Sequence, residues 1–213
     1  MIKAIFFDFD GVLVESVDIK TKAFADLFAH EGSRVVRKVV DYHIQNAGVP
    51  RYDKFRYIYR EILKRPLDDR KFECLCSRFA ECVIDNVVSA PYVKGALEFL
   101  EAYSSRYLCF VTSATPHVEL EEIIRRRGMA RFFRALYGAP TSKTGAIKEV
   151  LQREEIHPSM AVYIGDALSD YKAAQDNGIA FIAKINGNED IFDGIDCFRI
   201  RDLSTLSGTI IAM

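Results

Sequence analysis

The chain has 213 residues, of which 49% are hydrophobic, and a formal net charge of −1. This length suits one large domain, or one domain with a sizeable insertion, and the apolar content is enough for a core. Because the charges nearly cancel, no overall field favours nucleic acid or a membrane surface, and neither is expected as a partner.

The cysteines and the apolar runs indicate the compartment. The five cysteines are scattered along the chain, and no signal peptide is evident, so we expect reduced thiols and a cytoplasmic location. Cys74 and Cys76 have no second pair at the spacing of a closed zinc site. No apolar run reaches the length of a membrane span.

An apolar run near the N-terminus ends in two acids. The stretch 3–14 begins as an apolar run that reads as a buried strand, and this run ends in Asp8 and Asp10, followed by Gly11. Two carboxylates at the end of a buried strand are costly unless something compensates their charge, and a hard divalent cation would do so. An ordinary Asp-Gly turn remains the alternative on these residues alone.

Residues 15–90 show helical periodicity and no clear strand. Apolar stripes, together with glycine and proline positions, predict four helices that form a small antiparallel bundle. The expected helices cover residues 19–28, 34–46, 50–63 and 68 through at least 83.

From residue 95 onward, helices alternate with strands. This alternation predicts an α/β fold with a doubly wound parallel sheet, interrupted after its first strand by the helical bundle. We assign the core to residues 1–14 and 91–213 and the helical cap to residues 15–90. The expected later strands are 107–111, 134–137, 160–164 and 180–185, and the expected helices are 95–103, 116–128, 143–153 and 168–177.

Ligands of such sheets bind beyond the carboxyl ends of the strands. Asp8 and Asp10 follow the first strand, the hydroxyl-rich run 112–115 follows the second, and Asp166 and Asp170 follow the fourth. Lys143 lies between the third and fourth strands. The sequence therefore predicts acids, hydroxyls and one lysine at a single edge of the sheet.

These motifs, in this order, resemble those of the haloacid dehalogenase superfamily of phosphotransferases. They are Asp8-Phe-Asp10-Gly11, then Val111-Thr-Ser113-Ala-Thr-Pro116, then Lys143, then Gly165-Asp166-Ala-Leu-Ser-Asp170. The resemblance covers essentially the whole chain, and the helical insertion is similar to the cap of the phosphoglycolate phosphatase and β-phosphoglucomutase type.

The resemblance implies how the acids act. Asp8 would attack phosphorus and form an aspartyl-phosphate, while Asp10 would serve as general acid and then as general base. Asp8, the backbone carbonyl of Asp10, and Asp166 would hold Mg²⁺. Asp170 would bind the metal through water or position Lys143.

The resemblance also implies a phosphate cradle made of Ser113, the amide of Ala114, and Lys143. Two alternatives stay open here. Thr112 could be the phosphate ligand in place of Ser113, although the spacing to Pro116 favours Ser113. Ser113 could also serve only as a helix cap before Pro116.

The presence of Asp10 favours phosphoryl chemistry over dehalogenation, because a halide leaving group needs no proton. We expect a phosphatase that hydrolyses a small phosphomonoester, such as a sugar phosphate or a related metabolite. The alternatives are a phosphomutase, which the cap would decide by controlling access, and a catalytically silent regulatory or scaffold protein of the same fold. The expected oligomeric state is a monomer or a weak dimer.

The cap segment 49–57 is basic and aromatic. By resemblance to β-phosphoglucomutase-like enzymes, Arg51 is expected to reach the substrate, with Lys54 and Arg56 as neighbours. We expect Arg51 and Lys54 to recognise an anionic or polyhydroxylated group. A solvated helix start is the alternative.

Overall fold

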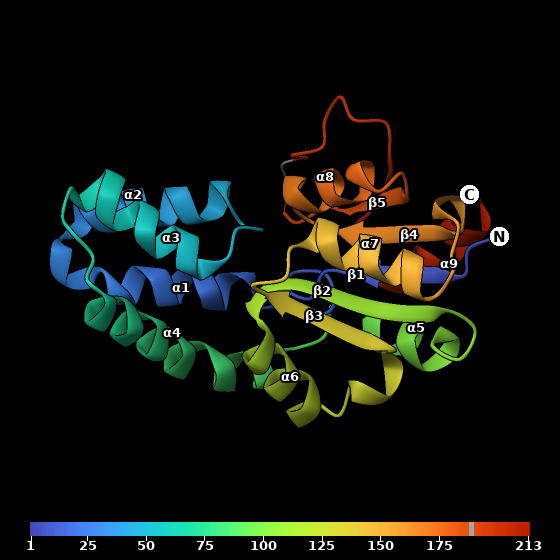
Figure 1. Ribbon diagram of the computed structural model, residues 1–213, viewed down its shortest axis with the longest axis horizontal. Helices are drawn as coiled ribbons and strands as arrows, with labels where there is room; N and C mark the ends of the chain where they lie inside the picture. The colour runs from blue at the N-terminus through green and yellow to red at the C-terminus, as the bar shows by residue number, and fades with distance from the viewer. Residues whose placement is uncertain (188–189) are drawn as a thin grey trace.

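A computed structural model describes residues 1–187 and 190–213, and its centre is a parallel β-sheet (Figure 1). The strand order is β3-β2-β1-β4-β5-β6, so the N-terminal strand lies in the middle of the sheet. The strands are β1 (Ala4–Phe7), β2 (Leu108–Pro116), β3 (Ala135–Ala139), β4 (Ala161–Gly165), β5 (Ala180–Lys184) and β6 (Phe198–Ile200).

Helices cover both faces of the sheet. In Figure 1, α7 and α8 lie on one side of the strands and α5 and α6 on the other. The alternation of side chains along β1 explains the two layers, since Ala4 and Phe6 pack in one buried cluster and Ile5 and Phe7 in the other. The helices are α5 (Ala96–Tyr103), α6 (His117–Arg126), α7 (Lys143–Arg153), α8 (Leu168–Asp176) and α9 (Leu206–Ile211).

Strand β6 and helix α9 were not predicted from the sequence. β6 has only three residues, and both Phe198 and Arg199 are exposed, so the strand lacks an apolar run. α9 is similarly short, at six residues. Apart from these two elements, the expected helices and strands are present, and the predicted fold class is confirmed.

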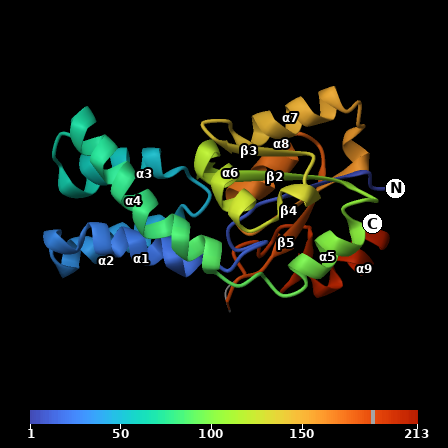
Figure 2. The ribbon, with the colours of Figure 1, turned by 90° about the horizontal axis from the view of Figure 1, so that it is seen from below.

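The insertion after β1 is entirely helical and projects beyond the carboxyl ends of the strands (Figures 1 and 2). The third expected helix begins as an α-helix and continues as a π-helical turn over Ile58–Leu63. The four cap helices are α1 (Val17–Leu27), α2 (Ser33–Gln45), α3 (Arg51–Tyr57) and α4 (Asp69–Ser89).

Aromatic side chains form the centre of the cap. Phe55 is fully buried, and its ring lies 5.5 Å from the ring of Phe24, 6.3 Å from that of Phe28 and 6.0 Å from that of Phe79. These contacts join α1, α3 and α4. The helices therefore share one core, which allows the cap to position side chains above the sheet.

The two connections between cap and sheet lie side by side. The amide of Glu15 donates to the carbonyl of Pro91 at 3.0 Å, and the amide of Val93 donates to the carbonyl of Leu13 at 3.1 Å. An antiparallel bridge between Val14 and Tyr92 lies between these bonds. The chain therefore leaves the core and returns to it through one short paired segment.

We expect Phe55→Ala to lower the free energy of unfolding by about 3–5 kcal/mol, because it opens a cavity among the rings. Urea unfolding followed by circular dichroism measures this loss. Phe198→Ala, at a residue 44% exposed, is the matched control and should change stability by about 0.5 kcal/mol or less. Equal losses in the two variants would contradict this account of the cap core.

Candidate active site

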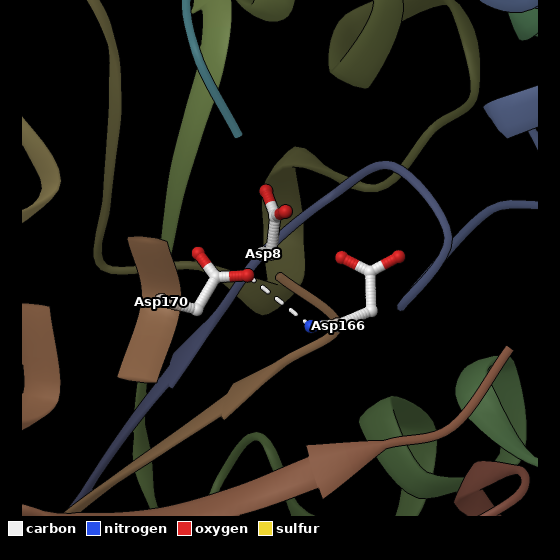
Figure 3. A group of neighbouring side chains, drawn as sticks. All are labelled: Asp8, Asp166 and Asp170. Carbon is white, nitrogen blue, oxygen red and sulfur yellow. Dashed lines mark hydrogen bonds between the residues drawn. The ribbon is translucent and has the colours of Figure 1, made fainter. Parts of the chain in front are cut away.

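The acids predicted from the first and fourth motifs meet at the carboxyl edge of the sheet. Phe7 pairs in register with Val111 on one side and Ile164 on the other, so the residues that come next on β1, β2 and β4 start at one level. Figure 3 shows Asp8, Asp166 and Asp170 together, and one carboxylate oxygen from each lies within 4.8 Å of the others.

Gly11 makes room for this cluster. Its φ of +77° lies in the left-handed region, and a β-carbon at this position would lie 2.2 Å from Oδ2 of Asp166. A residue with a side chain would therefore displace Asp166 from the strand-end loop. Asp10 and Gly11 do form a turn, which was the alternative interpretation from the sequence. The turn also leaves room for the Asp166 carboxylate.

Asp170 is fully buried and uses both carboxylate oxygens. Oδ2 accepts hydrogen bonds from the amides of Asp166 at 3.2 Å and Ala167 at 3.0 Å. Oδ1 accepts from Nζ of Lys143 at 2.5 Å and from the hydroxyl of Tyr163 at 3.1 Å. Asp170 thus contacts both the loop that carries Asp166 and the lysine.

Lys143 bridges the two sides of the cluster. Its Nζ lies 3.0 Å from Oδ2 of Asp8 and 2.5 Å from Oδ1 of Asp170. Burial alone would lower the pKa of Lys143, but Asp170 and Asp8 outweigh it and hold the pKa well above the ordinary value. The lysine is therefore a permanent cation beside Asp8.

Negative charge remains in excess at the cluster despite Lys143. Burial, with Asp170 and Asp10 adding to it against the opposing effect of Lys143, raises the pKa of Asp8 to about 7. Burial followed by repulsion from Asp8 raises the pKa of Asp166 well above its usual range. These carboxylates resist ionisation because the positive charge near them is too small. A hard divalent cation such as Mg²⁺, which takes oxygen ligands, would supply that charge.

Asp10 has partners of its own, separate from that cluster. Its Oδ2 pairs with Nζ of Lys20 and accepts from Thr115 Oγ1 at 3.1 Å, and its Oδ1 accepts from Ser16 Oγ at 2.6 Å. Burial would raise the pKa of Asp10, but the charge and hydrogen bond of Lys20 and the two hydroxyls lower it. In this arrangement Asp10 is an ionised carboxylate.

The structure separates the two hydroxyls that the sequence left as alternatives. Thr112 Oγ1 lies 2.6 Å from the hydroxyl of Tyr163 within the buried layer. Ser113 Oγ lies 3.4 Å from Oδ2 of Asp10 and accepts from the amide of Thr115 at 3.1 Å. Ser113 is thus the hydroxyl on the Asp10 side.

A cavity of about 70 Å³ lies between the cap and the carboxyl edge of the sheet. Asp8, Asp10, Ala114 and Asp166 line its core side. Its other walls are largely apolar and include Val17, Phe24, Val49, Phe79, Val83 and Ile123. This volume holds only a handful of water molecules, so the space above Asp8 suits a small molecule.

Lys54 lies in the cap wall of this cavity and is only 2% exposed. Its Nζ lies 3.0 Å from Nδ1 of His43 and 3.3 Å from the carbonyl of Ala47. Within the described residues, no carboxylate lies within ion-pair distance of it. Burial, followed by repulsion from Lys20, lowers the pKa of Lys54 to about 7.

His43 is neutral beside that lysine. Burial and then the charge of Lys54 lower the pKa of His43 to about 3. The cap therefore presents a lysine that still lacks an anion, with a neutral imidazole next to it.

Arg51 lines the same cavity, but its charge is already matched. Its guanidinium forms a two-pronged ion pair with Glu119 of α6, so the contact joins the cap to the core. Its Nε is buried and has no hydrogen-bond partner in the described part of the chain. Arg56, the third basic residue of this segment, is exposed and pairs with Asp53 instead.

The loop before α3 touches the core at a second place. A β-carbon on Gly48 would lie 1.8 Å from Oγ of Ser169 and 3.4 Å from the β-carbon of Ala167, both near the start of α8. The cap loop therefore contacts α8 through Gly48 and α6 through Arg51.

The comparison with protein families identifies the family to which this chain belongs. The sequence model described as haloacid dehalogenase-like hydrolase matches residues 5–184, which include every strand-end motif described above. The chain belongs to the haloacid dehalogenase-like hydrolase family. The predicted family, fold class and assignment as an enzyme are confirmed.

Individual relatives extend over nearly the whole hydrolase. Phosphoglycolate phosphatase of Synechococcus elongatus is 26% identical over 198 residues, which cover 88% of this chain and 86% of that protein. The crystal structure of a predicted phosphatase from Clostridium acetobutylicum is similar over 100% of both chains, with a TM-score of 0.78 and 16% identity. A CbbY mutant from Rhodobacter sphaeroides, in complex with xylulose-1,5-bisphosphate, has a TM-score of 0.77 and 19% identity over 97% of this chain and 96% of that one.

Several polar residues of this hydrolase were not selected in the sequence analysis, and Lys20, Thr115 and Asn186 among them could have been. Lys20 lies one turn before Phe24 on the buried side of α1, and this spacing could have marked it. Thr115 belongs to the hydroxyl run 112–115, which lies in the last part of β2 and from which Ser113 was selected. Asn186 follows β5, and its Nδ2 donates to Oδ2 of Asp166 at 2.5 Å, so the strand-end rule would have found it.

The part of the hydrolase that the structure describes contains no helix with both the length and the apolar character needed to cross a bilayer.

The stabilisation of this hydrolase by Mg²⁺ should grow as the pH rises from about 6 to about 8. Below a pKa of about 7, protons occupy Asp8, and the raised pKa of Asp166 adds to this competition, so a metal must displace protons to bind. The metal-free protein changes in the opposite direction, because a carboxyl with a raised pKa loses its contribution to stability as the pH rises through that value.

Differential scanning fluorimetry with and without Mg²⁺ measures this effect as the metal-induced rise in Tm at each pH. Asp166→Asn should reduce that rise at every pH. An equal metal-induced rise at both pH values in the unaltered protein would contradict the assignment of these acids.

Proposed function

We propose that this hydrolase is a Mg²⁺-dependent phosphatase that hydrolyses a small phosphomonoester through an aspartyl-phosphate on Asp8. The observation that carries the proposal is the position of the Asp8 carboxylate. It faces the cavity between cap and core, lies 3.0 Å from Nζ of Lys143 and has Asp166 beside it.

Asp8, Asp166 and the backbone carbonyl of Asp10 would hold the Mg²⁺ ion. When bound, the metal neutralises charge, so that an anionic nucleophile can approach an anionic phosphate. Asp170 takes part indirectly, because its carboxylate is used to hold the Asp166 loop and Lys143.

The first step is attack by Asp8 on phosphorus. The new bond joins a carboxylate oxygen of Asp8 to phosphorus, and the bond from phosphorus to the alcohol oxygen breaks. Lys143, the hydroxyl of Ser113 and the amide of Ala114 hold the phosphoryl oxygens as charge shifts among them. Lys143 suits this role because it stays protonated inside the site.

Asp10 manages the protons in both steps. It gives a proton to the departing alcohol oxygen, then removes one from the water that cleaves the aspartyl-phosphate. The contacts with Lys20 and Thr115 favour its ionised form, which is the form that the second step needs. Arrival of an anionic phosphate raises the proton affinity of Asp10 and so favours the form that the first step needs.

The cavity supports a small substrate with one anionic group away from the phosphate. Lys54 can pair with that group, because an anion beside it favours its protonated form, and the volume of about 70 Å³ favours a short molecule. Phosphoglycolate, which the name of the Synechococcus elongatus relative specifies, is a phosphomonoester of this kind because its far end is a carboxylate. The completeness of the set Asp8, Asp10, Lys143 and Asp166 favours an active enzyme over a silent scaffold.

Asp8→Asn should abolish phosphate release from a panel of small phosphomonoesters, since the nucleophile is lost. Release by the unaltered protein should require Mg²⁺ and stop with EDTA. Asp26→Asn, at an exposed aspartate of α1, is the matched control and should retain activity. No Mg²⁺-dependent release from the whole panel by the unaltered protein would favour the silent scaffold.

Lys54→Met should raise KM for phosphoglycolate by about tenfold or more, which is the loss expected for one charged hydrogen bond. KM for ethyl phosphate, which has no second charged group, should change by less than about threefold. Steady-state phosphate release on both substrates measures this, with Lys22→Met at an exposed lysine of α1 as the control. Equal changes for both substrates would show that Lys54 does not recognise the far end of the substrate.

A further inference from the structure

Three basic residues of the described part of the chain line the cavity, and two of them are paired with carboxylates. Lys20 pairs with Asp10, and Arg51 pairs with Glu119. Lys54 has no carboxylate within ion-pair distance in the described ranges. Among the described residues that line the cavity, Lys54 is therefore the basic residue left to pair with a substrate group beyond the reacting phosphate.

Burial, two hydrogen bonds and neighbouring aromatic rings hold the ion pair between Arg51 and Glu119 in place. The Arg51 side chain is 8% exposed and that of Glu119 is 16% exposed, so water screens the contact little. Both terminal nitrogens of the guanidinium bind the two carboxylate oxygens. The rings of Phe79 and Tyr52 lie 5.3 Å and 5.4 Å from the guanidinium carbon and fix its orientation.

The ion pair with Glu119 uses the hydrogen-bond donors and the charge with which Arg51 could otherwise bind a phosphate. Recognition of a phosphate by arginine uses two parallel N–H donors and a full positive charge. Glu119 occupies those donors and cancels the charge, and only the buried Nε is left without a partner. One N–H can meet a hydroxyl or a single carboxylate oxygen, whereas a dianionic phosphate would also face the carboxylate of Glu119.

We infer that Glu119 is a specificity-determining residue that excludes substrates with a second phosphate by neutralising Arg51. The inference rests on the proposed phosphatase function and narrows its substrate class. The accepted substrates are monophosphates whose far end carries at most one negative charge, and bisphosphates are disfavoured.

The test measures binding in the presence of a constant excess of Mg²⁺, on a background of Asp8→Asn, so that no ligand is turned over. Isothermal titration calorimetry compares 3-phosphoglycerate with 2,3-bisphosphoglycerate, which differ by one phosphate. Adding Glu119→Gln should tighten binding of the bisphosphate at least tenfold, or about 1.4 kcal/mol. Binding of the monophosphate should change by less than about threefold.

Control variants separate recognition from folding and cap closure. Adding Arg51→Gln to Glu119→Gln should remove the gain for the bisphosphate, because the gain comes from the released guanidinium. Glu122→Gln, at a more exposed glutamate of the same helix, should change neither affinity. The Tm of each variant confirms that it is folded.

Equal changes for both ligands would overturn the inference, because they would show that the pair only holds the cap closed. The absence of measurable binding of the bisphosphate to the Glu119→Gln variant would overturn it as well. Failure of the phosphatase proposal would be seen separately, as no phosphate release from any monoester by the unaltered enzyme.

Discussion

The buried carboxylate of Asp170 is the contact on which the site depends. Its four hydrogen bonds connect the loop after β4, the first residue of α7 and the interior of the sheet. A buried charge persists only when it is paired and fully hydrogen-bonded, and Asp170 meets both conditions. The positions of Lys143 and Asp166, and through Lys143 that of Asp8, follow from this residue.

The acids at the sheet edge divide into two groups with opposite electrostatics. Burial and neighbouring carboxylates raise the pKa values of Asp8 and Asp166, and Lys143 does not offset these effects. Asp10 lies two residues from Asp8, yet the Lys20 contact lowers its pKa. The same short segment therefore provides one carboxylate suited to a metal and another suited to proton transfer.

The sequence was sufficient for the residues at the strand ends, for a physical reason. In a parallel sheet the carboxyl ends align, so Asp8, Ser113 and Asp166 could be placed together from strand positions alone. The partners of the cap residues could not be placed in this way. Glu119 lies 68 positions after Arg51 on a different part of the fold, and nothing local in either helix indicates the contact. The same limit hid the Lys20 contact with Asp10. The short edge strand at Phe198 was missed for another reason, since it lacks an apolar run.

The cap loop and the start of α8 are in close contact at Gly48. Its missing side chain leaves no gap, because the space that a methyl group would need is already filled by the hydroxyl of Ser169. Any other residue at position 48 would push the cap loop away from α8 and widen the cavity. The smallest residue of the loop therefore lets the cap lie close over the carboxyl edge of the sheet, and so it limits the size of the molecule that fits above Asp8.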